Sequence, residues 1–166
     1  MSKVELNHKP DKKPTHKKCP KFEDAVALYL DNSDEQERAL GFCAWLRTNK
    51  LSPLAGNSGY NWYISQNKQR ILQLKMYNDT WYITTRWEII DELISKEELK
   101  EVLWANICYC TLCNTQGCSW GTLDLDLFGR EFKGVCRQFM LRIGNPDART
   151  INLMKEFIMA RKQHTS

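Results

Sequence analysis

Five of the seven cysteines lie close together in the chain, and their spacing is the strongest chemical signal in the sequence. Zinc prefers four thiolate or imidazole ligands in a tetrahedron. Two thiolates come from the Cys110-x2-Cys113 knuckle, a third follows at Cys118, and Cys136 supplies the fourth after a polar and acidic run. We therefore predict a structural zinc site formed by Cys110, Cys113, Cys118 and Cys136, with Cys108 as an alternate ligand.

The same cysteine pattern has other interpretations. In a secreted chain it would predict disulfides, but residues 1–18 contain no apolar segment or cleavage site typical of secretion. An iron–sulfur cluster and a redox dithiol are further alternatives. The redox interpretation requires a CxxC pair that opens a helix, whereas this pair is predicted to follow one. A zinc ion in the reducing cytoplasm is the favoured interpretation.

The positive charge of the chain is concentrated at its beginning. The sequence holds 24 basic and 20 acidic residues, and residues 1–18 carry six lysines against two acids, so the whole excess of +4 lies there. The low apolar content of this segment predicts a disordered basic tail, either a solubilising terminus or an electrostatic arm. We expect a single domain over residues 19–166, with a metal-binding segment at 108–136. No apolar run is long enough to span a bilayer, so no membrane role is expected.

Apolar periodicity predicts two helices at the start of the domain, over residues 22–29 and 33 to about 48, the second opened by a capping box of Ser33 and Gln36. We expect the second helix to bury Ala39, Leu40, Phe42, Cys43 and Leu46. Period-two alternation then predicts three antiparallel strands between residues 60 and 86.

Further helices are predicted over residues 87–93 and from a capping box at Ser95 to about Asn106. Alternation over residues 135–143 predicts a fourth strand. A final helix should begin with Pro146 in its first position and end near Lys162. The predicted fold class is α+β: an antiparallel sheet of about four strands packed with helices, plus a four-cysteine zinc-binding loop.

Several features together resemble a family of small uncharacterised bacterial proteins. They are a Trp-containing meander, the Cys110-x2-Cys113-x4-Cys118 cluster, Phe128-Gly129-Arg-Glu-Phe132 before Val135-Cys136, and Asn145-Pro146-Asp147-Ala148. The resemblance covers about residues 22–162. It implies an α+β fold with a metal site and carries no activity.

The predicted strands are rich in aromatic side chains that could line a pocket, because small-molecule sites combine apolar walls with a few polar anchors. The alternative is that these aromatics form the core. The candidate ligand-binding residues are Trp62, Tyr63, Arg70, Trp81, Tyr82, Arg86 and Trp87.

Catalytic residues are not predicted. The histidines are His8, His16 and His164, all near the chain ends, so Ser-His-Asp and Cys-His centres lack a base in the body of the chain. Asp124 and Asp126 could bind a hard cation or act as acid and base, but their alternation with leucines favours a solvated strand edge.

Three classes of function remain. The first is a non-enzymatic module for small-ligand binding, sensing or regulation, with a structural zinc site. The second is an interaction module for nucleic acid or protein that uses the zinc knuckle and the basic tail, which the neutral body disfavours. The third is a thiol-redox or metal-handling enzyme. We predict the first; the ligand and the oligomeric state are not specified by the sequence.

Overall fold

The computed structural model describes residues 19–57, 60–85, 94, 96–109, 121–138 and 140–164. The elements follow one another in the order α1 (Phe22–Tyr29), α2 (Ser33–Thr48), β1 (Leu54–Ala55), β2 (Asn61–Gln66), β3 (Gln69–Tyr77), β4 (Thr80–Thr85), α3 (Glu97–Ala105), β5 (Thr122–Leu127), β6 (Arg130–Cys136), β7 (Leu141–Gly144) and α4 (Ala148–His164). The α+β class is confirmed. The predicted tail at 1–18 and the predicted helix at 87–93 lie outside the described residues.

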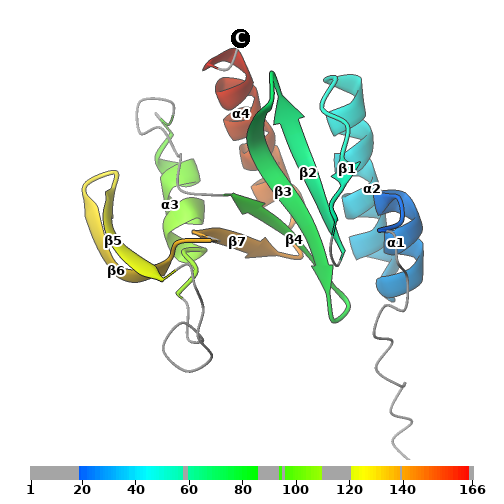
Figure 1. Cartoon of the computed structure of the whole chain (residues 1–166), viewed down its shortest axis with the longest axis horizontal. Helices are drawn as coiled ribbons and strands as arrows, with labels where there is room; N and C mark the ends of the chain where they lie inside the picture. Colours follow the sequence, from blue (N-terminus) through cyan, green and yellow to red (C-terminus); the bar gives the residue numbers. More distant parts are fainter. Residues whose placement is uncertain are drawn as a thin grey trace, which may run out of the picture.

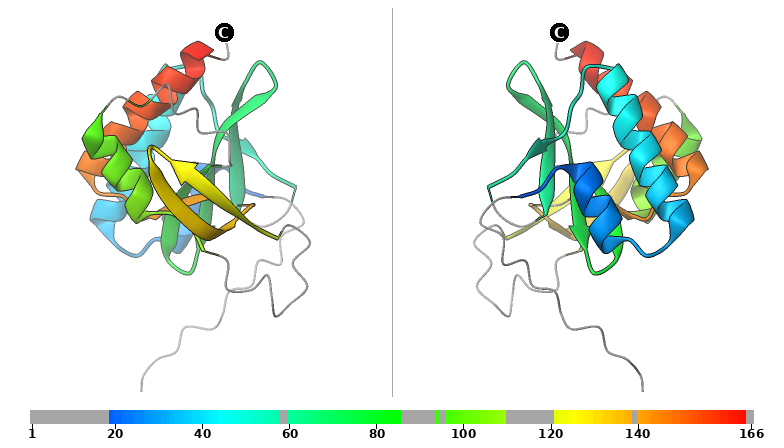
Figure 2. Two further views of the ribbon diagram at one scale, coloured as in Figure 1. Left: turned by 90° about the vertical axis from the view of Figure 1, so that its left-hand side faces the viewer. Right: turned by 90° about the vertical axis from the view of Figure 1, so that its right-hand side faces the viewer.

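Strands β1, β2, β3, β4 and β7 form a five-stranded antiparallel sheet in that order, and β5 pairs with β6 in a separate two-stranded sheet (Figure 1). Helices α1, α2 and α4 cover one face of the larger sheet (Figure 2). Within the described part of the chain, no helix has the length and apolarity that crossing a membrane requires.

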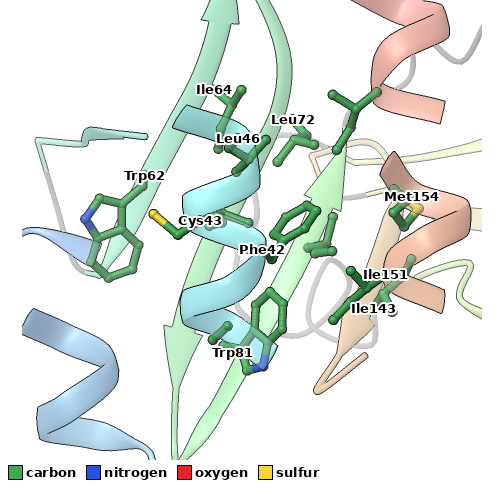
Figure 3. Close-up of a cluster of buried hydrophobic side chains, with 14 of the residues drawn as sticks. Phe42, Cys43, Leu46, Trp62, Ile64, Leu72, Trp81, Ile143, Ile151 and Met154 are labelled. Carbon is green, nitrogen blue, oxygen red and sulfur yellow. The ribbon is translucent and has the colours of Figure 1, made fainter. Parts of the chain in front are cut away.

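The main hydrophobic core lies between this sheet and the helices (Figure 3). Trp62 and Trp81 come from the sheet and contact Phe22 of α1, with ring centroids 5.0 Å and 6.3 Å apart respectively, and Trp81 also packs on Phe42 of α2. Burying each such side chain stabilises the fold by about 1.5–3 kcal/mol, so this layer supplies most of the apolar stabilisation.

Helix α2 begins as predicted at Ser33, but the residue that caps it is Asn32. The Oδ1 atom of Asn32 accepts the backbone N–H groups of Asp34 at 2.9 Å and Glu35 at 3.1 Å. The predicted cap, Ser33, is instead the first helical residue. Of the five residues predicted to be buried, Leu40 is 39% exposed, because it lies at the edge of the inward stripe.

A second, smaller core joins the β5–β6 hairpin to α3. Its buried members are Ile107, Leu125, Leu127, Phe132, Val135 and Met140. Trp104 of α3 packs against this cluster, and its indole N–H donates to the carbonyl oxygen of Leu127 at 2.9 Å. This contact fixes the hairpin to the helix that precedes it.

The prediction of a single strand over residues 135–143 is wrong, because this stretch contributes one strand to each of the two sheets. Strand β6 ends at Cys136 and pairs with β5, whereas β7 begins at Leu141 and pairs with β4. Residues 107–109 lie between these two strands. Ile107 pairs with Leu141 of β7, and Tyr109 pairs with Val135 of β6. The ladder therefore continues from the large sheet to the hairpin through this short segment.

Helix α4 begins later than predicted. Its first residue is Ala148, and the Asp147 carboxylate accepts the Thr150 N–H at 2.7 Å, so Pro146 precedes the helix. Asn145 is bonded to β4, since its side chain accepts the Trp81 N–H at 3.0 Å. The chain is thus anchored to the sheet just before α4 starts.

Candidate ligand face and metal centre

The face of the large sheet opposite the helices carries polar and aromatic side chains. Cross-strand partners point to the same face of a sheet. One row of partners is Tyr63, Gln73, Thr84 and Arg142, and a second is Asn61, Lys75, Tyr82 and Gly144. We call the polar face the set Asn61, Tyr63, Arg70, Gln73, Lys75, Tyr82, Thr84 and Arg142. Among the described residues that the register places on this side, none is an aspartate or a glutamate.

The sheet divides the predicted ligand-binding residues between its two sides. Tyr63, Arg70 and Tyr82 belong to the polar face, where all three are half-buried. Trp62 and Trp81 point the other way and are 1% and 0% exposed, so they are core residues rather than part of a common wall. The reason is the period of two along a strand, which sends successive aromatics to opposite faces. Arg86 and Trp87 lie outside the described residues.

Each tyrosine of the polar face contacts both a glycine and an arginine. A methyl group on Gly144 would lie 2.9 Å from Cε1 of Tyr82, and one on Gly56 would lie 2.9 Å from Cε2 of Tyr63. The rings therefore occupy the space that these glycines leave. The guanidinium carbon of Arg142 is 4.2 Å from the Tyr82 ring centroid. In the same way, Arg70 lies 3.9 Å from the centroid of Tyr63.

These stacks orient the two arginines. A guanidinium over an aromatic face gains a cation–π contact and keeps its N–H edges available for hydrogen bonds. Sequence reasoning identified Tyr63, Arg70 and Tyr82 but missed Arg142, Gly56 and Gly144. The alternation of apolar and polar residues over 141–143 could have placed Arg142 on this side. The glycine contacts depend on strand order, which the sequence pattern does not contain.

The centre of the polar face is buried. Gln73 is 5% exposed and donates to the side-chain oxygen of Asn61, and Thr84 is 1% exposed and donates to the Gln73 carbonyl oxygen at 3.1 Å. Burial, with the positive charge of Arg142, lowers the pKa of Lys75 to about 8, while the thiols of Cys136 and Cys108 act in the opposite direction. The pKa of Lys75 therefore depends on both the arginine and the cysteines.

Two of the predicted metal-site cysteines are neighbours on adjacent strands. The pairing of Tyr109 with Val135 places Cys108 directly opposite Cys136, and the Cys136 N–H donates to the Cys108 carbonyl oxygen at 2.8 Å. Side chains at such positions have Cβ atoms roughly 5 Å apart. On its other side Cys136 pairs with Thr122. Residues 109 and 122, which flank the other clustered cysteines, are therefore both fixed beside Cys136.

The predicted ligands Cys110, Cys113 and Cys118 lie outside the described residues. In the part of the chain that is described, no group of three histidine, cysteine or acidic side chains is arranged to hold a metal ion. Cys108 and Cys136 are a pair of compatible donors, since zinc accepts thiolates. A complete tetrahedral shell requires further ligands from beyond these two strands.

The remaining cysteines have the character of core thiols. Cys43 is fully buried, and burial together with the Glu23 carboxylate raises its pKa to about 11. Its Sγ donates to Glu23 at 3.3 Å, and Glu23 is also paired with Arg47. Burial likewise raises the pKa of Cys19. A raised pKa lowers the fraction of nucleophilic thiolate at both cysteines.

The two aspartates of β5 have local hydrogen-bonding roles. Asp126 accepts the Gly129 N–H at 2.9 Å within the hairpin turn, and Asp124 accepts the Gly134 N–H at 2.8 Å across the hairpin. Leu125 and Leu127 point inward between them. The interpretation as a solvated strand edge is confirmed.

Comparison with known proteins returns no relative of this chain: no family model matches it, and no curated protein or solved structure shows significant similarity.

Proposed function

We propose that this protein is a non-enzymatic binding module whose polar face holds a small ligand, with a structural zinc site at the edge where the cysteines meet the sheet. The observation that supports it best is the pair of Gly–Tyr–Arg contacts on one sheet face, because both arginines are oriented by rings that are themselves fixed. Positioned polar groups beside aromatic surface are what small-ligand sites require.

The buried amide at the centre of the polar face supports the same proposal. Gln73 is almost inaccessible and shares a hydrogen bond with Asn61, so these polar groups are held in fixed orientations rather than solvated freely. Gln73 thus holds the partly exposed Asn61 side chain in place, and a fixed polar group lowers the entropic cost of binding. A surface that served only to keep the protein in solution would not require side chains held in fixed orientations.

For the metal, we propose Cys136 with Cys113, Cys118 and either Cys108 or Cys110. The position of Cys108 opposite Cys136 favours Cys108 over Cys110 as the second ligand from the sheet side. The zinc ion would tie the chain between Tyr109 and Gly121 to the sheet. Its part is structural, since binding free energy in such sites contributes directly to folding.

Native mass spectrometry of untagged protein tests both parts together. We expect a mass above the 19.5 kDa chain that includes one zinc ion and one small molecule. Tyr82→Ala should release the small molecule and retain zinc, because it removes the ring beneath Arg142. Cys136→Ser should lose zinc.

Leu28→Ala is the control, since Leu28 is 60% exposed on α1, in the helical layer away from the polar face. It should keep both zinc and the small molecule. A chain that carries no extra mass in native spectra, or a Tyr82→Ala variant that keeps its small molecule, would contradict the ligand-binding proposal.

A further inference from the structure

The polar face contains three basic side chains and, within the described residues, no acidic one. Lys75 pairs directly with Tyr82 in the sheet, and Arg142 lies over the Tyr82 ring, so both cations are neighbours of the same residue. Like charges held close together raise the local positive potential, which favours an anion.

Two other exposed arginines have carboxylate partners. Arg47 pairs with Glu23 at 2.7 Å, and Arg149 pairs with Glu98 at 3.3 Å. Arg142 differs, because no described carboxylate forms an ion pair with it and its side chain is exposed. Its guanidinium is nevertheless oriented by Tyr82, and Tyr82 in turn fills the space above Gly144. An exposed arginine that is held in place is suited to recognise a ligand.

The chemistry of a guanidinium narrows the class of ligand. Its planar fork of N–H donors matches the two oxygens of a carboxylate or a phosphate, and such charge-assisted pairs are stronger than neutral hydrogen bonds. An arginine already lies over one face of each tyrosine ring, which removes that face from stacking with bases. A small oxyanion therefore fits the polar face better than a single-stranded nucleic acid.

We infer that the ligand of the polar face is a small organic oxyanion, a carboxylate or a phosphate ester, bound by the Arg142 guanidinium with Lys75 as the second cation. This inference rests on the proposed ligand-binding function and specifies its chemistry. Tyr82 is a positioning residue that holds Arg142, and Gly144 makes room for it.

Matched pairs of charged and neutral probes test the inference. We would titrate ¹⁵N-labelled full-length protein with benzoate and benzamide, and with phenyl phosphate and phenol, and follow the backbone amides of β4 and β7 and the Arg142 Nε–H by NMR. Benzoate or phenyl phosphate should shift these signals, and its neutral partner should not. The stronger of the two anions identifies the ligand as carboxylate or phosphate.

Arg142→Gln should weaken binding of the effective anion at least about tenfold, the effect expected for the loss of a charge-assisted hydrogen bond. Arg149→Gln, which removes an exposed arginine from α4, should bind as the wild type does. Added salt should weaken binding only modestly, because a single small anion forms few ion pairs that the salt can screen.

Each other result would overturn the inference in a recognisable way. Equal shifts with benzamide or phenol would show a neutral-ligand site, in which case the proposed function stands and the oxyanion does not. Unchanged binding in Arg142→Gln would place the anion elsewhere. A short oligonucleotide that binds far more tightly than phenyl phosphate, with a steep salt dependence, would assign the face to nucleic acid. No shift with any probe would remove the inference, and the bound mass in native spectra would then decide separately whether the proposed function stands.

Discussion

Gly144 shows how much a single position contributes to the polar face. It pairs with Tyr82 across the two strands, and the ring lies where a side chain at Gly144 would otherwise be. The same relation joins Gly56 and Tyr63 on the same face, near the β1 edge of the sheet. Aromatic side chains that cover a neighbouring glycine are a known way to stabilise strand pairs. Here they also determine where two arginines lie.

Gly144→Ala should therefore destabilise the protein by about 1–3 kcal/mol, because the new methyl group would be 2.9 Å from Tyr82 and the ring must move. Chemical denaturation monitored by circular dichroism measures the free energy of unfolding. The control is Gly41→Ala in α2, where no atom lies within 4 Å of the added methyl group. Gly41→Ala should stabilise by about 0.5–1 kcal/mol, the gain expected for alanine in a helix. Equal changes in the free energy of unfolding for the two substitutions would show that the contact with Tyr82 does not contribute to stability.

At the scale of elements, the ends of helices depend on side chains that sequence patterns identify only approximately. Asn32 and Ser33 are both good capping residues, and the capping-box pattern favoured Ser33. In the structure Asn32 has extended backbone angles and accepts two amide hydrogens, while Ser33 is already helical. A shift of one residue changes which side chain accepts the free backbone N–H groups at the start of the helix.

Asn32→Ala should lower the free energy of unfolding by about 1 kcal/mol, since two amides at the start of α2 lose their acceptor. Ser33→Ala should change it by no more than about 0.5 kcal/mol, because alanine is favourable inside a helix. Thermal and urea unfolding of the two variants compare them directly. A larger loss for Ser33→Ala would reverse the assignment of the cap.

Helix α4 is joined to the sheet by a buried arginine. Arg161 lies on the apolar stripe of the helix and is 6% exposed. Its Nη1 donates to the Ile71 carbonyl oxygen at 2.7 Å and to Thr85 Oγ1 at 3.0 Å. Ile71 lies where the β2–β3 register shifts, so its carbonyl is turned toward the helix rather than toward β2. The arginine therefore stabilises an irregularity in β3.

At the scale of the whole molecule, residues 107–109 link the two sheets, which carry two hydrophobic clusters. The large sheet, α1, α2 and α4 share one core with Leu99 and Leu103 of α3, and the hairpin packs against Trp104 of α3 in a second core. Residues 107–109 pair with both sheets, and Cys136 ends the strand that faces them. A zinc ion at this junction would stabilise the arrangement of the two sheets as well as the chain around it.

Cys113→Ser should therefore remove zinc and leave the protein unfolded or aggregated, because metal-binding free energy is folding free energy in structural sites. Elemental analysis gives the zinc content, and calorimetry gives the melting transition. Cys19→Ser is the control: this half-buried thiol donates to the Asn61 carbonyl oxygen at 3.6 Å, a contact that a hydroxyl can replace. It should retain zinc and melt near the wild-type temperature. A stable Cys113→Ser variant with an unchanged transition would contradict the structural role.

Local pattern was enough to predict much of the fold. Helices α1 and α2, the β2–β3–β4 meander and the inward leucines of β5 follow from periodicity, because the repeat of apolar residues differs between helix and strand. The α+β class follows from their sum. The cysteine spacing predicts a metal site on chemical grounds, and that site stays a prediction.

Other features depend on contacts between distant residues, which periodicity does not contain. The tertiary structure decided that residues 135–143 divide between two sheets, that Trp62 and Trp81 are core while Tyr63 and Tyr82 are not, and that Cys108 lies opposite Cys136. It also decided which glycine lies beneath each tyrosine. The physical reason is the same in each case: strand order and register are set by how whole faces pack, and only these bring Arg142, Tyr82 and Lys75 together.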